Sequence, residues 1–297
     1  MLWIAVTLPL LPLEAVRPPV PSTSYPSLPS EGVEADADAV SAPRCYALAD
    51  HTRILIADLD ALRLGVQPGN TRSHALALAP GLVLLEPDPA REIRAFEALA
   101  LALLAYTPKV SLAQSHTLLL EVGSGLRLFG GVRALLARVA ATVAGCGHIA
   151  RIACAPTAWG AWTLAQAHAT RSSRRWHVLK ETTLSRVLDA LPVALAPFAA
   201  QHDHALTQIG CATLGDLRRL PRDGIVRRFG DGVLGWLAQA RGEAPDPRVW
   251  FAAPPSFHAS LELQARVESA EALLFAARRL VMQLAGWLAA QHAALSG

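Results

Sequence analysis

The hydrophobic pattern at the start of the chain favours a buried strand over a targeting segment. The chain opens MLWIAVTLPLLPLEAV, in which an apolar run over Leu2 to Thr7 precedes two prolines. Short apolar runs bounded by turn residues are typical of buried strands. A secretory signal needs a basic start and an unbroken apolar stretch. This segment has no Lys or Arg and is interrupted by Pro9 and Pro12.

The pattern then alternates between strands and helices. One or two strands are predicted in Cys45 to Ala57, and others in GLVLLEPD, at Val110 to Leu112, at Thr117 to Val122 and at His148 to Ala155. Helices are predicted at Asp58 to Leu64, Thr71 to Leu78, Asp88 to Tyr106 and Leu126 to Val143, and from Pro156 onwards. This order predicts an α+β fold, with a mixed or antiparallel sheet and helices on one side.

The second half of the chain is mainly helical in pattern. Helices are predicted at Leu184 to Leu191, in GIVRRFGDGVLGWLAQARGE and at Ser269 to Leu295, with a strand in HASLELQARV. Pro245 to Pro255 is a proline-marked linker. Arg17 to Pro43 is rich in Pro, Ser and acidic residues, so it is predicted to be a loop or a disordered insertion.

Composition places the chain among large globular proteins. Its 297 residues are 52% hydrophobic, enough for a large core and more than one domain. The mean hydropathy of +0.31 raises the question of a membrane. However, no uncharged apolar run reaches about 18 residues, so no membrane-spanning helix is expected. The four cysteines (Cys45, Cys146, Cys154, Cys211) lack CxxC spacing, which argues against zinc or disulfides and favours a reducing cytoplasm.

The basic residues and one glycine-containing turn raise the possibility of DNA binding. The net charge is only +3, but arginines cluster at Arg171, Arg174 and Arg175, and at Arg218, Arg219, Arg222, Arg227 and Arg228. Such clusters suit a phosphate backbone, although a solvated basic surface is the plain alternative.

IGCATLGDL has the pattern of a helix-hairpin-helix, with a turn at Gly210, Thr213 opening the second helix and Gly215 following it. The free amides at the start of that helix would hold a phosphate. An ordinary helix pair joined by a glycine turn is the alternative.

The order of several segments resembles the Y-family (translesion, UmuC-like) DNA polymerases over nearly the whole chain. MLWIAVTLPLLPLEAV resembles the first palm strand, and LDALRLGVQPGN the fingers segment. YTPKVSLAQSHTLLLEV and ARIACAPTAWGAWTLAQ resemble two further palm segments. LPV with IGCATLGDL resembles the thumb, and SLELQARVESAEALLF the start of the little finger.

The resemblance implies the right-hand architecture of that family. A ferredoxin-like palm would comprise residues 1–16 and 78–180, with small fingers at 44–77 and the insertion at 17–43. A helical thumb with the helix-hairpin-helix would span 181–247, and a partial little finger 251–297. Because so little of a little finger follows Phe251, we expect a truncated or degraded copy.

The resemblance also implies that catalysis has been lost. DNA synthesis uses two Mg²⁺ ions held by carboxylates, which the family supplies as one Asp and an Asp–Glu pair. Those positions fall on Ala5, His116 and Thr117. The family's nucleotide contacts fall on Leu10, Leu59, Leu62 and Ala158. No metal or other cofactor is therefore expected.

Two groups of residues could modify this interpretation. Nearby acids that could replace the metal ligands are Glu14, Asp58, Asp60 and Glu121. Glu121 matches an acidic family position that is not a metal ligand and lies roughly 13 Å along a strand from Thr117. Trp159 and Trp162 suggest a base-stacking platform, but their spacing on a helix is more typical of packing.

The function implied is that of a non-catalytic polymerase homologue in the cytoplasm, with no membrane association. It would bind primer–template DNA and act as an accessory hub in SOS-induced translesion synthesis, mutagenesis and DNA repair. Partners implied by resemblance are the sliding clamp, a RecA-like companion and an error-prone C-family polymerase. No clear clamp motif is present, since QLAGWL from Gln283 lies in a predicted helix. The alternatives are an active polymerase with an atypical metal site and a DNA-binding module without partners.

Overall fold

The computed structural model describes residues 1–18, 45–167, 177–261 and 270–295 of the chain. Nearly all of the expected insertion at Arg17 to Pro43 lies outside these ranges. So do the arginine cluster at Arg171 to Arg175 and most of the strand expected in HASLELQARV.

A four-stranded antiparallel sheet forms the centre of the molecule. Its strands are β1 (Trp3–Thr7), β5 (Val110–Ala113), β6 (Thr117–Glu121) and β7 (Arg151–Ala155), in the order β5-β6-β1-β7. Helix α4 (Pro89–Leu103) precedes β5, and α5 (Val132–Gly145) connects β6 to β7. This split βαββαβ arrangement is ferredoxin-like, and it confirms that the chain starts with a buried strand.

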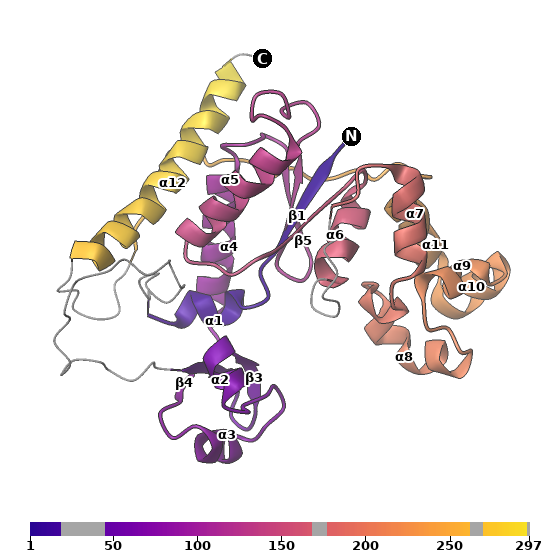
Figure 1. The fold of residues 1–297 in the computed structure, drawn as a ribbon, viewed down its shortest axis with the longest axis horizontal. Helices are drawn as coiled ribbons and strands as arrows, with labels where there is room; N and C mark the ends of the chain where they lie inside the picture. Colours follow the sequence, from indigo (N-terminus) through magenta and orange to yellow (C-terminus); the bar gives the residue numbers. More distant parts are fainter. Residues whose placement is uncertain (19–44, 168–176, 262–269, 296–297) are drawn as a thin grey trace, which may run out of the picture.

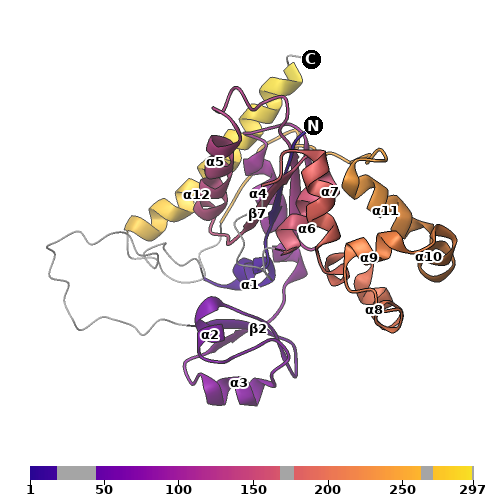
Figure 2. The same ribbon diagram turned by 45° about the vertical axis from the view of Figure 1, so that its right-hand side comes forward.

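Helices cover both faces of the central sheet (Figures 1 and 2). Ile4 and Val6 of β1 lie in the core shared with α4 and α5, whereas Trp3 and Ala5 lie in the core shared with α6 (Ala158–Ala167). The expectation of helices on one side is therefore wrong. The reason is local: every residue of β1 is buried, so each face of this strand needs a cover.

A smaller sheet carries its own helices below the central sheet in Figure 1. It contains β2 (Tyr46–Ala49), β3 (Ile54–Ala57) and β4 (Val83–Leu85), packed with α2 (Leu59–Arg63) and α3 (Arg72–Leu78). Helix α1 (Leu11–Val16) covers the other face. Because β4 pairs with β2 in parallel, the boundary expected at residue 78 is placed too early, and this unit extends to Leu85.

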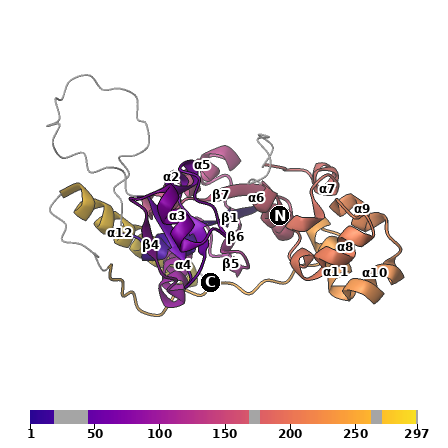
Figure 3. The same cartoon turned by 90° about the horizontal axis from the view of Figure 1, so that it is seen from below.

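The helices α7 to α11 gather at one end of the molecule (Figures 1 and 3). They are α7 (Glu181–Asp189), α8 (Ala199–Gln208), α9 (Leu214–Arg219), α10 (Arg222–Phe229) and α11 (Asp231–Arg241), with a short 3-10 turn at Val193–Leu195. They share one core with α6 and the adjacent sheet face.

Glycines at positive φ account for two differences from the predicted helices. Gly230, at φ +85°, ends α10 and separates it from α11. Gly130 and Gly131, at φ +78° and +95°, delay the start of α5 to Val132, although the pattern predicts a start at Leu126. Such conformations are left-handed and interrupt a helix.

The last helix, α12 (Ala270–Leu295), lies along α4. A Cβ built on Gly286 would overlap the carbonyl of Leu101, so the two helices approach very closely there. Segment Leu273–Gln291 is long and apolar enough to cross a membrane by length and composition. The sequence pattern did not predict that property. The same helix carries Arg278 and Arg279 and packs Met282 and Trp287 against the core next to α4.

Candidate functional site

Two of the three positions that correspond to metal ligands in the resemblance, Ala5 and Thr117, lie on the paired strands β1 and β6. Ala5 pairs with Leu119, and Thr7 pairs with Thr117, so all four side chains belong to the sheet face that α6 covers. Ala5 and Thr117 are completely buried, and Thr7 is almost so. Ala5 and Thr117 therefore have no surface accessible to solvent.

Two hydroxyl groups lie on this face where β1 ends and β6 begins. Thr7 Oγ1 and Thr117 Oγ1 are hydrogen-bonded at 2.8 Å. Gln166 Nε2, from α6, lies 3.4 Å from the Thr117 hydroxyl and 3.5 Å from that of Thr7. The hydroxyls thus satisfy one another within the fold, as buried polar groups require.

His116 does not join Ala5 and Thr117. It lies in the β5–β6 turn with φ +48°, beside Ser115 at +57°. Its ring contacts the edge of Phe96, with ring centroids 6.2 Å apart, and its Nε2 lies 3.9 Å from Glu92 Oε2. Both partners belong to α4. The turn therefore directs His116 away from the α6 face.

Each acid considered as a replacement ligand has a structural partner. Glu14 accepts hydrogen bonds from the amide of Ile149 at 2.9 Å and pairs with His148 Nδ1 at 2.8 Å. Asp58 caps α2 and accepts from the amides of Tyr46 and Ala61, each at 2.7 Å. The other two acids pair with a cation nearby in the fold: Asp60 with Arg63, and Glu121 with Lys109.

The positions matched to nucleotide contacts are apolar and separated. Leu59 and Leu62 are exposed on α2 of the smaller unit. Ala158 is buried at the start of α6, and Leu10 is half-buried before α1. None of these side chains can donate a hydrogen bond to a phosphate.

The stretch interpreted as a helix-hairpin-helix forms the connection from α8 to α9. Gly210 has φ +67°, and nothing lies within 4 Å of the place that a Cβ would take, so this glycine serves the turn itself. A Cβ on Gly215 would lie 2.8 Å from the carbonyl oxygen of Asp189, so this glycine allows α9 to approach α7. Both glycines thus have a structural reason in the fold.

Three of the amides at the start of α9 have partners within the fold, contrary to the expectation of free amides. Thr213 and Asp216 form a capping box, in which the Thr213 amide donates to Asp216 Oδ2 and the Asp216 amide donates to Thr213 Oγ1. The amide of Leu214 donates to the carbonyl of Leu191. A carboxylate, a hydroxyl and a backbone carbonyl of the fold therefore each accept from one of the amides that were expected to hold a phosphate.

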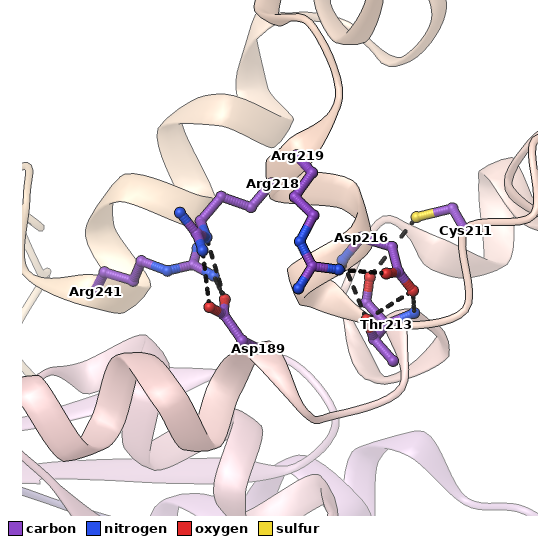
Figure 4. A network of polar contacts seen from close by, with 7 residues as sticks. All are labelled: Asp189, Cys211, Thr213, Asp216, Arg218, Arg219 and Arg241. Atoms are coloured by element: carbon purple, nitrogen blue, oxygen red, sulfur yellow. Dashed lines mark hydrogen bonds and ion pairs between the residues drawn. The ribbon is translucent and has the colours of Figure 1, made fainter.

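Asp189 connects three helices of this unit (Figure 4). At the end of α7, its carboxylate pairs with Arg218 of α9, at 3.0 Å and 3.3 Å, and with Arg241 of α11. Burial raises the pKa of Asp189, but hydrogen bonds from Arg241 and Arg218 outweigh it and hold the pKa below its ordinary value. Arg219 pairs with Asp216 at 3.1 Å.

The arginines of the predicted DNA-binding group therefore fall into two sets. Arg218 and Arg219 are committed to carboxylates within the fold. Arg227 and Arg228, with Arg222, are exposed on α10, and none of the three forms an ion pair with another described residue. Only the second set presents unneutralised charge to a ligand.

The two tryptophans of α6 agree with the packing interpretation. Trp162 is buried, and its Nε1 donates to the carbonyl of Gln114. Trp159 contacts the edges of Trp162 and Trp236, and the guanidinium of Arg248 lies 4.4 Å from its ring centroid. Trp162 is therefore closed to a base, and the ring of Trp159 is already in contact with Arg248.

Sequence reasoning missed Asp189 and Gln166. Asp189 follows the apolar pattern of α7 as an ordinary helix-end residue, and its two partners are distant in sequence. Gln166 is a polar residue near the end of α6, a helix that is otherwise almost entirely apolar. A single amide side chain in such a helix is the sequence signal that could have indicated a buried hydrogen bond.

Comparison with known structures identifies the class of the fold. The chain matches a ternary complex of Dbh with a TM-score of 0.59, and DinB from Sulfolobus solfataricus with a TM-score of 0.58. Each match has 15% identity and covers 84% of this chain and 69% of the other. A chimeric Y-family DNA polymerase built on Dbh matches equally well. The fold is that of a Y-family DNA polymerase, as the sequence predicts.

Within that class, the sequence is similar to Protein ImuB. ImuB from two strains of Caulobacter vibrioides is 31% identical over 183 residues, which is 62% of this chain and 39% of the relative. The chain therefore spans about two fifths of the length of these curated relatives. No protein-family model matches the chain. The chain is thus similar in sequence to ImuB and has the fold of the Y-family DNA polymerases.

Proposed function

We propose that this chain is a non-catalytic Y-family homologue that binds primer–template DNA and serves as an accessory protein in translesion synthesis. One observation carries the proposal: at the metal-ligand positions, the sheet face holds Ala5 and a hydrogen-bonded pair of threonine hydroxyls, all buried. Alanine offers no oxygen, and two neutral hydroxyls are poor ligands for Mg²⁺, which prefers carboxylates. Within the described ranges, no group of three or more His, Cys, Asp or Glu residues could hold a metal.

The test is primer extension with the purified chain. We expect the chain to bind a fluorescent primer–template, as measured by anisotropy. In the same tube, with all four nucleotides and either Mg²⁺ or Mn²⁺ present, we expect no extension of the primer. A known polymerase at equal concentration controls for the substrate. Extension that persists after repurification and in a Glu121→Ala variant would refute the proposal and favour an active polymerase with an atypical metal site.

DNA contact is proposed to occur through the exposed arginines of α10. Replacing both Arg227 and Arg228 with Ala should weaken primer–template binding and lower the salt slope of the affinity by about two, because each phosphate contact contributes about one. Arg219→Ala is the matched control, since that side chain already pairs with Asp216. Equal loss in the two variants would place the DNA elsewhere on the molecule.

The proposed cellular role and partners rest on the similarity to ImuB. We propose a cytoplasmic role in the SOS response, with the sliding clamp, a RecA-like companion and an error-prone C-family polymerase as partners. QLAGWL, the segment nearest to a clamp motif, lies within α12, where Trp287 Nε1 donates to the carbonyl of Pro254 at 2.8 Å. That geometry favours packing. A pull-down from damaged cells separates a hub from a DNA-binding module without partners.

A further inference from the structure

A basic cavity lies on the side of the molecule formed by α1, α4, the segment 251–261 and α12. Its volume is about 720 Å³, within the size range of small-molecule sites. None of the residues discussed above at the β1–β6 pair or on α9 and α10 lines it. Its charged lining contains two acids, Glu14 and Glu97, and a larger number of arginines: Arg17, Arg91, Arg94 and Arg279.

The acids near this cavity leave much of its positive charge uncompensated. Glu14 lies 3.8 Å from Arg17, but its carboxylate makes its short hydrogen bonds with His148 and Ile149. Arg91 pairs with Asp88 at 3.3 Å. For Arg94, no carboxylate lies within ion-pair distance in the part of the chain that the structure describes.

Arg279 provides an independent sign of an anion site. Its Nε is buried and has no hydrogen-bond partner within the described residues. Burial lowers the pKa of Arg279; the neighbouring Cys146 and Glu14 act in the opposite direction, while Arg17 lowers it further. A buried guanidinium N–H without an acceptor is costly. An anion in the cavity would remove that cost.

The lining also indicates the chemical class of the ligand. Ala95, Ala98 and Leu101 of α4, with Phe251, give the cavity an apolar wall beside the arginines. Guanidinium groups bind phosphate oxygens with two parallel hydrogen bonds, and several of them favour more than one phosphate. We propose that this cavity binds a nucleotide-sized ligand that carries more than one phosphate group.

The experiment is calorimetric titration of the full chain, without added metal, using pyrophosphate, dATP and citrate as probes. We expect one saturable site for pyrophosphate or dATP and at least tenfold weaker binding of citrate, which matches the size and charge but has no phosphate. Stronger binding of dATP than of pyrophosphate supports a nucleoside contact with the apolar wall. Equal binding supports a ligand recognised by its phosphates.

Variants at two positions decide whether the cavity is the site. Arg94→Ala, on the exposed rim, and Arg279→Gln should each weaken binding about tenfold, the loss expected for one charge-assisted contact. Arg133→Ala on α5, which does not line the cavity, should leave binding unchanged. Absence of saturable binding, equal affinity for citrate, or equal loss in Arg94→Ala and Arg133→Ala would overturn the proposal. Binding of a DNA oligonucleotide alone, with neither phosphate probe, would overturn it as well.

Discussion

At the scale of single residues, internal hydrogen bonds satisfy the polar groups that the fold buries. The Thr7 and Thr117 hydroxyls meet at 2.8 Å between β1 and β6, where the resemblance leads to an acidic cluster. A neutral pair buried in this way needs no counter-ion, whereas a carboxylate would. The same principle applies to Glu14, whose buried carboxylate is matched by His148 and a backbone amide.

The threonine pair makes a prediction about stability. Thr117→Val keeps the shape but leaves the Thr7 hydroxyl without its best partner, so it should lower the free energy of unfolding by about 1–3 kcal/mol. The double variant Thr7→Val with Thr117→Val should cost less than the sum of the single changes, because both polar groups are removed. Urea denaturation measures all four proteins. Strict additivity would show that the two hydroxyls do not interact.

At the scale of elements, helix ends and helix contacts control the assembly. Asp189, at the end of α7, holds α9 and α11 through two arginines. Gly215 allows the close approach of α9, and Gly286 does the same for α12 against α4. Single residues therefore determine how these helices are placed, although the helices themselves follow from their apolar patterns.

Asp189 predicts a pH dependence. Because its folded pKa is depressed, its stabilising contribution is complete above its unfolded pKa of about 3.9 and is lost as the pH falls through the folded value. Asp189→Asn should lower the free energy of unfolding by about 2 kcal/mol near pH 7, less than a fully buried pair, since Asp189 is 27% exposed. The difference from wild type should shrink below about pH 4.

The control for that measurement is Asp223→Asn, the same chemical change at an exposed position of α10. It should lower the free energy of unfolding by no more than about 0.5 kcal/mol, the usual contribution of an exposed acid in the first turn of a helix. A constant deficit of Asp189→Asn from pH 7 to pH 2 would show that packing, not ionisation, explains its effect.

The close contact of α12 with α4 at Gly286 should not tolerate a side chain at this position. Gly286→Ala should destabilise the protein by about 1–3 kcal/mol, because the added methyl group would overlap the backbone of Leu101. Gly235→Ala, inside α11, meets nothing within 4 Å. It should instead raise stability by up to about 1 kcal/mol. Thermal unfolding of the two variants measures both changes in stability. If Gly286→Ala changed the stability as little as Gly235→Ala, α12 would not pack against α4 at Leu101.

At the scale of the whole molecule, the sequence was sufficient for the architecture but not for its contacts. Periodicity located β1, α4 and β6, and segment order indicated the Y-family fold. The pairing of β4 with β2 was missed because a three-residue apolar strand carries no sign of its partner. The capping box at Thr213 was missed as well, since the same residues fit a phosphate site until the Asp216 carboxylate is placed in space.

The burial of Ala5 has an evolutionary consequence under the proposed function. An aspartate introduced there alone would stand against Leu119 and Ala153 in an apolar core, with neither a metal nor a second carboxylate to share it. A first step back towards catalysis at Ala5 would therefore weaken the fold before any activity appeared. Under the proposed function, the burial of Ala5 thus makes the loss of synthesis hard to reverse by a single substitution at this position, whereas exposed residues remain free to change.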